Sequence, residues 1–329
     1  MRALRLDLVE IVALWLIAAI VVAGAVFGSR LALYNLTIIA LFATIAISLN
    51  LLLGLAGQAS FAQTTFMAIG GYGLAILSKT AGLNPWLAIL IALVMSSILA
   101  LLLGRVLLRL RGHYLSMGTL ALALGTYSFV NASSLTNGGW GISGVPPLTI
   151  GDFSFRDPVA FLLLAWALCG ASLLVYRLLG ASQIGRAWRT LSTRQDVAAT
   201  LGIDVPRYKL IALMIAAAMA TLAGALYVSF TRFVGPDLYD IAQVINLMFM
   251  LFVGGLRSTV GPIVGAAFVI LVPQLVAGLE RYQNLVFFLL LLLVILVRPT
   301  GLFGRTGGVR TLASLLPARL REWRRERRR

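Results

Sequence analysis

Residues 34–53 read YNLTIIALFATIAISLNLLL, an apolar run without an acidic or basic side chain. A transmembrane helix needs roughly 20 apolar residues to cross a hydrocarbon core of about 30 Å. The run meets that length by itself, so it predicts a helix that spans a membrane. The glycine-rich sequence GLAGQASFAQTTFMAIGGYG follows at 54–73 and brings polar side chains to the end of this predicted span.

Apolar windows of similar length recur along the chain and predict further spans. They lie near 11–27, 59–78, 86–104, 114–131, 159–176, 210–230, 241–256, 261–278 and 284–297. Hydrophobic residues make up 60% of the 329 residues and charged residues only 12%, with a mean hydropathy of +0.97, which excludes a soluble domain. The predicted fold is all-α, a polytopic transmembrane helical bundle of about 10 spans, with about eight spans and two re-entrant segments as the alternative.

The net charge of +16 reflects the order of the chain across the membrane. Basic residues gather at 105–111, at 177–209 and at 298–329. Cytoplasmic loops of membrane proteins carry an excess of Lys and Arg, so all three segments are predicted to be cytoplasmic, with both termini inside. The expected partner of the basic tail is the anionic lipid of the bilayer and not nucleic acid, and a solvated, disordered tail is the alternative.

The predicted spans carry no acidic residue or histidine in their interiors. The acidic residues lie outside the spans or, like Glu10 and Glu280, at their edges, and His113 begins a span beside a basic segment. A proton-coupled carrier usually keeps a titratable side chain in its bundle, so this class is disfavoured. The single cysteine, Cys169, provides neither a disulfide nor a thiolate metal site. We expect no catalytic residue, metal or cofactor, and the chain has no P-loop sequence of its own for ATP.

Neutral polar side chains do enter the predicted spans. They surround the first glycine-rich stretch and recur near 241–256, and the candidates for a translocation path are Gln58, Ser60, Gln63, Thr64, Gln243 and Asn246. Such groups suit the passage of a zwitterion or an amide. The alternative is that each forms hydrogen bonds between helices and lines no path.

The segment LSTRQDVAATLGIDVPRYK at 191–209 predicts a short helix in the long basic loop. Ser192 is a good N-cap, and Gln195 three residues later completes a capping box. Gly202 suits the left-handed position after the helix, and Pro206 prevents continuation. The helix would cover about nine residues, 193–201, and isolated helices shorter than ~12 residues are marginal in water, so it needs a partner surface.

The residues of this helix suggest what the partner surface is. Val197 and Leu201 are four residues apart and share one face with Ala198, a small apolar surface that fits a groove of a partner subunit. The alternative is a helix that lies on the lipid interface, but the apolar face is small and has no aromatic anchor.

Five ordered motifs in residues 34–297 resemble the LivM-type permease subunit of branched-chain amino acid ABC importers. The matching residues are Gly57, Gln58, Ser60, Phe66, Gly70 and Tyr72; Arg111, Gly112, Tyr114, Thr119, Leu120 and Ala121; Thr136, Gly138, Gly139, Gly141, Gly144 and Pro146; Gly185, Arg186, Ala187, Arg189, Ala198, Ala199, Leu201, Gly202, Tyr208 and Lys209; and Gly254, Gly255, Gly261, Pro262 and Gly265. The chain departs from this pattern at Gln63, where histidine is common, at Arg257, where glycine is usual, and at Gln195 and Asp196, where acidic residues often stand.

The resemblance implies one of two non-identical permeases in a bacterial inner membrane, joined by two ABC ATPase subunits and served by a periplasmic substrate-binding protein. The helix at 193–201 would be the coupling helix that meets an ATPase, with Arg194, Asp196, Val197, Ala198, Ala199, Leu201 and Gly202 as its contact residues. The chain then divides into the N-terminal end and first span at 1–33, the permease domain at 34–297 with its coupling loop at 177–209, and the tail at 298–329.

Three other functions are compatible with the residues. A urea or short-chain amide permease of the same family would share all of these motifs. A stand-alone channel or sodium-coupled carrier would use broken helices at the two glycine-rich stretches, 54–73 and 254–265. A membrane scaffold without a transport role is disfavoured by the loop helix.

Overall fold

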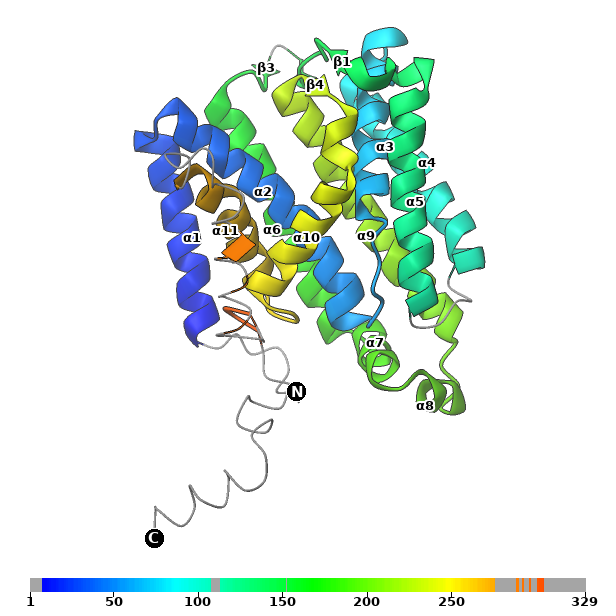
Figure 1. Ribbon diagram of the computed structural model, residues 1–329. Helices are drawn as coiled ribbons and strands as arrows, with labels where there is room; N and C mark the ends of the chain where they lie inside the picture. Colours follow the sequence, from blue (N-terminus) through cyan, green and yellow to red (C-terminus); the bar gives the residue numbers. More distant parts are fainter. Residues whose placement is uncertain are drawn as a thin grey trace.

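A computed structural model describes residues 8–107, 113–151, 153–275, 288–289, 292, 296 and 301–304. The described helices are α1 (Leu8–Phe27), α2 (Arg30–Asn50), α3 (Gln63–Ala75), α4 (Pro85–Leu107), α5 (His113–Ala132), α6 (Pro158–Ala181), α7 (Gln183–Thr193), α8 (Gln195–Thr200), α9 (Val205–Thr231), α10 (Ile241–Gly254) and α11 (Gly261–Leu275). Two π-helical turns, η2 (Leu51–Leu55) and η3 (Ile76–Thr80), prolong α2 and α3. The long helices form a bundle, with α7 and α8 at one end (Figure 1).

Short irregular elements occupy the other end of the bundle (Figure 1). They are the 3₁₀ turns η4 (Ser134–Thr136), η5 (Gly138–Trp140) and η6 (Pro236–Tyr239) and the strands β1 (Ile142–Ser143), β2 (Thr149–Ile150), β3 (Phe153–Ser154) and β4 (Phe233–Val234). Strand β1 pairs antiparallel with β4, with Ile142 opposite Val234, and β2 pairs antiparallel with β3. The β1–β4 ladder ties the long loop after α5 to the loop after α9, whereas the β2–β3 ladder lies within the loop after α5.

The helices confirm the helical membrane bundle that the apolar windows predict. Within the described residues, five helical segments are long and apolar enough to cross a membrane by length and composition: 10–27, 30–55, 85–105, 158–181 and 205–231. Helices α10 and α11 are apolar but shorter. In the predicted window at 59–78, the helix begins only at Gln63. The preceding residues, 56–62, are not helical. Most of the window at 284–297 and nearly all of the tail at 298–329 lie outside the described residues.

Helix α2 forms the centre of the bundle. Its apolar window is 94% buried, against 11% for α1 and 33% for α4 and α6. This burial explains why 34–53 is apolar on every face: it packs against protein, mainly α6, α9 and α11, and not against lipid on one side.

Helices α3 and α9 pack with their backbones in close contact. A Cβ on Gly70 would lie 2.0 Å from the carbonyl oxygen of Thr221, and one on Gly224 would lie 2.2 Å from that of Met67. The Thr221 hydroxyl lies 3.1 Å from the carbonyl oxygen of Phe66 and 2.7 Å from Ser96 Oγ on α4. Small residues and buried hydroxyls are the usual means of holding helices together within a membrane.

We expect Gly224→Val to lower the thermal stability of the protein in detergent. The side chain would overlap the α3 backbone, and overpacking of this kind costs about 1–3 kcal/mol. Gly170→Val on α6 is the matched control, because Gly170 is exposed and nothing lies within 4 Å of its would-be Cβ. Equal melting temperatures for the two variants would contradict the close α3–α9 contact.

Candidate functional site

Helix α7, which the sequence analysis did not predict, holds the long basic loop against the bundle. Ser182 accepts a hydrogen bond from the backbone N–H of Gly185 at 3.3 Å and caps the helix. Trp188 is fully buried, and its Nε1 donates to the carbonyl oxygen of Tyr208 at 2.8 Å. Ala187 and Leu191 are buried beside it. The spacing of these apolar residues was the signal that could have revealed α7.

The predicted capping box at Ser192 is wrong. Ser192 belongs to the last turn of α7, where its Oγ donates to the carbonyl oxygen of Arg189 at 2.9 Å. The chain becomes extended at Arg194, with φ −150° and ψ 110°, and α8 starts at Gln195 without a side-chain cap. The buried positions at 187, 188 and 191 carry α7 past Ser192, so α8 covers Gln195–Thr200 and not 193–201.

The predicted end of the short helix is confirmed. Gly202 has φ +78°, the left-handed region that glycine adopts without steric cost. Its N–H donates to the carbonyl oxygen of Ala199 at 3.0 Å, and the N–H of Ile203 donates to that of Ala198 at 3.1 Å. This pair of bonds is the Schellman motif. Pro206 then lies in the first turn of α9, where a missing N–H costs nothing.

The apolar residues of α8 do not form the single face that was expected. Ala198 is fully buried and packs against its own subunit. Val197 is 43% exposed and Leu201 is 68% exposed. The exposed residues of the predicted contact set also include Arg194, Asp196, Ala199 and Gly202. Ala198 thus fixes α8 to the bundle, and the exposed apolar surface consists of Val197 and Leu201.

A buried lysine connects α8 to the membrane domain. Lys209 is only 2% exposed, and its Nζ donates to Gln195 Oε1 at 3.2 Å. Its carbonyl oxygen accepts a hydrogen bond from Gln58 Nε2 at 3.3 Å. Gly57, with φ +67°, lies against α7 so closely that a Cβ would be 2.6 Å from Ser192 Cα. The non-helical segment before α3 is therefore in direct contact with the loop that carries α8.

The path candidates near the first glycine-rich stretch are all buried within the subunit. Gln58 and Ser60 line a cavity of about 10 Å³, at the lower limit of ~10–15 Å³ that holds one water. Ser60 Oγ accepts a hydrogen bond from the backbone N–H of Ala62 at 3.3 Å. Among the described residues, the Gln63 amide and the Thr64 hydroxyl have no hydrogen-bond partner.

Gln243 and Asn246 lie on a different helix, one turn apart on α10. Both are half-buried. Asp240 caps α10 by accepting a hydrogen bond from the backbone N–H of Gln243 at 2.8 Å. The structure thus places the six candidates in two groups, one before and within the start of α3 and one on α10.

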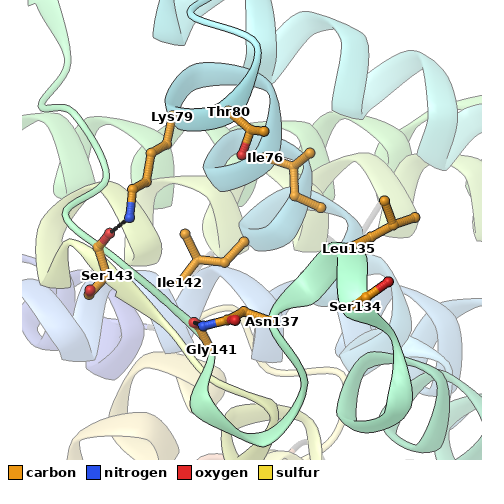
Figure 2. Close-up of a pocket in the computed structure, with 9 residues that line it drawn as sticks. All are labelled: Ile76, Lys79, Thr80, Ser134, Leu135, Asn137, Gly141, Ile142 and Ser143. Atoms are coloured by element: carbon orange, nitrogen blue, oxygen red, sulfur yellow. Dashed lines mark hydrogen bonds between the residues drawn. The ribbon is translucent and has the colours of Figure 1, made fainter.

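An open pocket of about 380 Å³, which the sequence did not predict, lies between η3, the turns after α5 and β1 (Figure 2). Strand β1 lies at the end of the bundle opposite α8 (Figure 1). It is lined by Ile76, Lys79, Thr80, Ser134, Leu135, Asn137, Gly141, Ile142 and Ser143. Lys79 Nζ donates to the carbonyl oxygen of Ser143 at 2.5 Å, which connects η3 to β1.

Tyr239 lies in the turn η6, which precedes α10. Burial raises the pKa of its hydroxyl well above the ordinary value, so the hydroxyl remains protonated.

The fold and these two ends define a multispanning helical membrane protein, with the short helix α8 at one end and an open pocket at the other. The chain belongs to the family described as branched-chain amino acid transport system, permease component, whose model matches residues 31–295. This membership confirms the resemblance that the five sequence motifs indicated.

Several characterised relatives agree with this assignment. The chain is 30% identical over 319 residues to the high-affinity branched-chain amino acid transport system permease protein LivM of Escherichia coli K12, which covers 89% of this chain and 75% of that protein. It is 27% identical to LivH of the same organism over 80% of this chain and 91% of that protein. It is 25% identical to BraD of Pseudomonas aeruginosa over 82% of this chain and 94% of that protein. No solved structure matches the chain significantly.

Proposed function

We propose that this chain is one of two paired permeases of an ABC importer for branched-chain or related small amino acids in a bacterial inner membrane. Two ATPase subunits, a second paralogous permease and a periplasmic substrate-binding protein complete the assembly. The family supports the class, and the relatives LivM, LivH and BraD carry the name of branched-chain amino acid transport permeases. ATP hydrolysis then takes place on separate subunits.

The observation that carries the proposal is the exposed pair Val197 and Leu201 on an anchored α8. The Schellman motif and the Lys209–Gln195 bond hold this helix in place, so its apolar side chains are presented in a fixed geometry. A preformed apolar surface binds a partner groove at a lower entropic cost than a mobile one. We infer that this partner is an ATPase subunit, because the chain belongs to a family of transport-system permease components.

We place α7 and α8 on the cytoplasmic side, with both termini on that side as well. The support is the excess of Lys and Arg at 177–209 and 298–329, since cytoplasmic loops carry this excess. The open pocket that contains Lys79 then faces the periplasm, where the substrate-binding protein delivers the amino acid.

The translocation path runs, in this proposal, beside Gln58, Ser60, Gln63 and Thr64 and along Gln243 and Asn246 on α10. The support is the burial of Gln63 and Thr64 without a hydrogen-bond partner among the described residues. A buried polar group without a partner is costly, and a path that opens during transport would give it one. The small cavity beside Gln58 and Ser60 corresponds to a closed state of that path.

We expect Gln63→Leu to reduce amino acid uptake while the melting temperature stays equal or rises. A buried polar group without a partner costs about 1–3 kcal/mol, so its removal does not destabilise the fold. The loss of one hydrogen bond to the solute, ~1.4 kcal/mol, corresponds to about tenfold slower uptake. Thr37→Val is the control and should transport normally, because the buried Thr37 hydroxyl on α2 donates to the Leu33 carbonyl oxygen of its own helix and has no other bond among the described residues. Normal uptake by Gln63→Leu would remove Gln63 from the path.

The direct test of the function is a pull-down of the tagged chain in mild detergent, followed by mass spectrometry and reconstitution in liposomes. Recovery of two ATPases and a second permease, together with ATP-dependent uptake of leucine, isoleucine or valine, is the expected result. Recovery of the chain alone, still able to move solute without ATP, would replace the proposal with a channel or carrier. Uptake of urea or amides in place of amino acids would change the substrate and keep the class.

A further inference from the structure

The loop between α10 and α11 is fixed to the end of α2 through Arg257. Arg257 has φ +62°, a backbone region that favours glycine. Its backbone N–H donates to Asn50 Oδ1 at 3.0 Å, and Asn50 Nδ2 donates to the carbonyl oxygen of Ser258 at 2.8 Å. Asn50 is fully buried. These two bonds hold the left-handed turn in place against the end of α2.

The Arg257 side chain reaches the loop that carries α8. Its Nε donates to the carbonyl oxygen of Gly54 in the π-helical turn η2 at 2.8 Å, and its Nη2 donates to Ser192 Oγ at 3.1 Å. Ser192 lies in the last turn of α7, two residues before the extended Arg194 that separates α7 from α8. One guanidinium group therefore joins the α10–α11 loop, the end of α2 and the loop of α8.

The other side of the same loop is bound to α11 and to α1. Ser258 Oγ accepts a hydrogen bond from the N–H of Gly261, the first residue of α11, at 3.0 Å. The backbone N–H of Thr259 lies 3.4 Å from Glu10 Oε1 on α1. Helices α10 and α11 also touch at Gly254 and Gly261, where a Cβ on Gly254 would lie 1.9 Å from the Gly261 carbonyl oxygen. The loop that carries Arg257 is thus joined directly to α11 and to α1, and α10 and α11 are in close contact with each other.

The connection through Lys209 leads to a different part of the bundle. Lys209 bonds Gln195 on α8, and its own backbone belongs to α9 and bonds Gln58 before α3. The Arg257 connection begins at Ser192 and ends at α10 and α11. Among the described residues, the loop of α8 thus has a polar connection to the segment before α3 that holds Gln58, and another to the end of α10, the helix that carries Gln243 and Asn246.

We propose that Arg257 is a positioning residue that transmits the displacement of the α8 loop to the α10–α11 pair. The inference rests on the proposed function, in which an ATPase moves α8. The chemistry suits the task, because a planar guanidinium presents several donors in a fixed fork and can hold Gly54 and Ser192 at once, whereas a lysine ammonium is a single point of contact. Arg257 is exposed, so its replacement has little effect on folding.

The test compares Arg257→Ala, Arg257→Lys and Ser192→Ala in the complete transporter with its ATPases and binding protein in liposomes. The measured quantity is the number of amino acid molecules taken up per ATP hydrolysed. We expect Arg257→Ala and Arg257→Lys to lower this ratio by about tenfold, within the ~5- to 150-fold range of typical couplings. Ser192→Ala should lower it less, and the double variant should be no worse than Arg257→Ala alone.

The control is Arg30→Ala, which removes an exposed arginine from the first residue of α2 and should keep the parental ratio. Recovery of the ATPases and the melting temperature should be unchanged in every variant. A parental ratio in Arg257→Ala, additive effects of the two substitutions, or a loss of ratio that only follows loss of assembly would each overturn the role of Arg257. If the unmodified chain is purified and no ATPase copurifies with it, the proposed function is overturned, and this inference with it.

Discussion

Leu201→Asp abolishes ATP-driven uptake while the subunit remains folded and inserted. Leu201 directly follows α8 and is 68% exposed, so a carboxylate there is fully solvated in the isolated subunit and leaves its stability nearly unchanged. In the proposed complex, the same carboxylate would enter an apolar groove of the ATPase, and an unpaired buried charge costs about 3 kcal/mol or more. This cost corresponds to docking at least about a hundredfold weaker.

The measurement is uptake and ATP hydrolysis by the same liposomes, together with the amount of ATPase that copurifies. Val197→Asp, on the same exposed surface, should behave like Leu201→Asp. Thr200→Asp adds the same charge to an exposed residue of α8 beside this surface and is the control that should retain transport. Normal uptake by Leu201→Asp would remove α8 as the docking helix, and equal losses in all three variants would point to charge repulsion in general.

The sequence was sufficient to predict the bundle because membrane spans leave a strong local signal. Nine of the predicted windows coincide with described helices, from 11–27 on α1 to 261–278 on α11. The signal is strong since every backbone polar group must be satisfied within the membrane, which makes long apolar helices nearly obligatory. Boundaries were less certain, as the late start of α3 at Gln63 shows.

The loop of α8 was predicted less well, because the decisive contacts are distant in sequence. The predicted left-handed conformation of Gly202 was correct, since the turn after a helix depends on a local property of glycine. The capping box failed, because the burial of Trp188 and Leu191 extends α7 through Ser192, and burial against other helices cannot be read from four residues. Tertiary packing here outweighed a local preference that is typically worth only about 1 kcal/mol.

The connections that give the loop its role were not predictable from the sequence. The motif comparison marked Lys209 as a matching residue and Arg257 as a departure, but it predicted no contact for either, and basic residues beside spans are usually exposed to water or lipid head groups. Lys209 is in fact buried beside Gln195, and Arg257 reaches Ser192, which is 65 residues away in the chain. Neither contact has a periodic or compositional signature, so only the folded structure reveals them.

Gly57→Ala should also abolish transport, because it separates the loop of α8 from the segment before α3. Gly57 has φ +67°, and its would-be Cβ lies 2.6 Å from Ser192 Cα and 2.7 Å from Ser192 Cβ. A methyl group cannot fit at these distances, and Ser192 cannot rotate away because the contact is to its backbone. The chain must move α7 outward or distort 56–62, and either change disturbs the Gln58–Lys209 bond and the position of α8 together.

The effect of the clash can be separated from the effect of backbone strain. A left-handed backbone costs a non-glycine residue about 1–2 kcal/mol wherever it occurs. Gly82 has φ +68°, nearly the same as Gly57, but nothing lies within 4 Å of its would-be Cβ. Gly82→Ala therefore carries the strain without the clash, and it should lose some thermal stability and keep its uptake per ATP. If Gly57→Ala loses no more transport than Gly82→Ala, the contact between Gly57 and Ser192 has no part in coupling. A loss confined to Gly57→Ala, with the ATPases still bound, would locate the transmission of the ATPase movement at this contact.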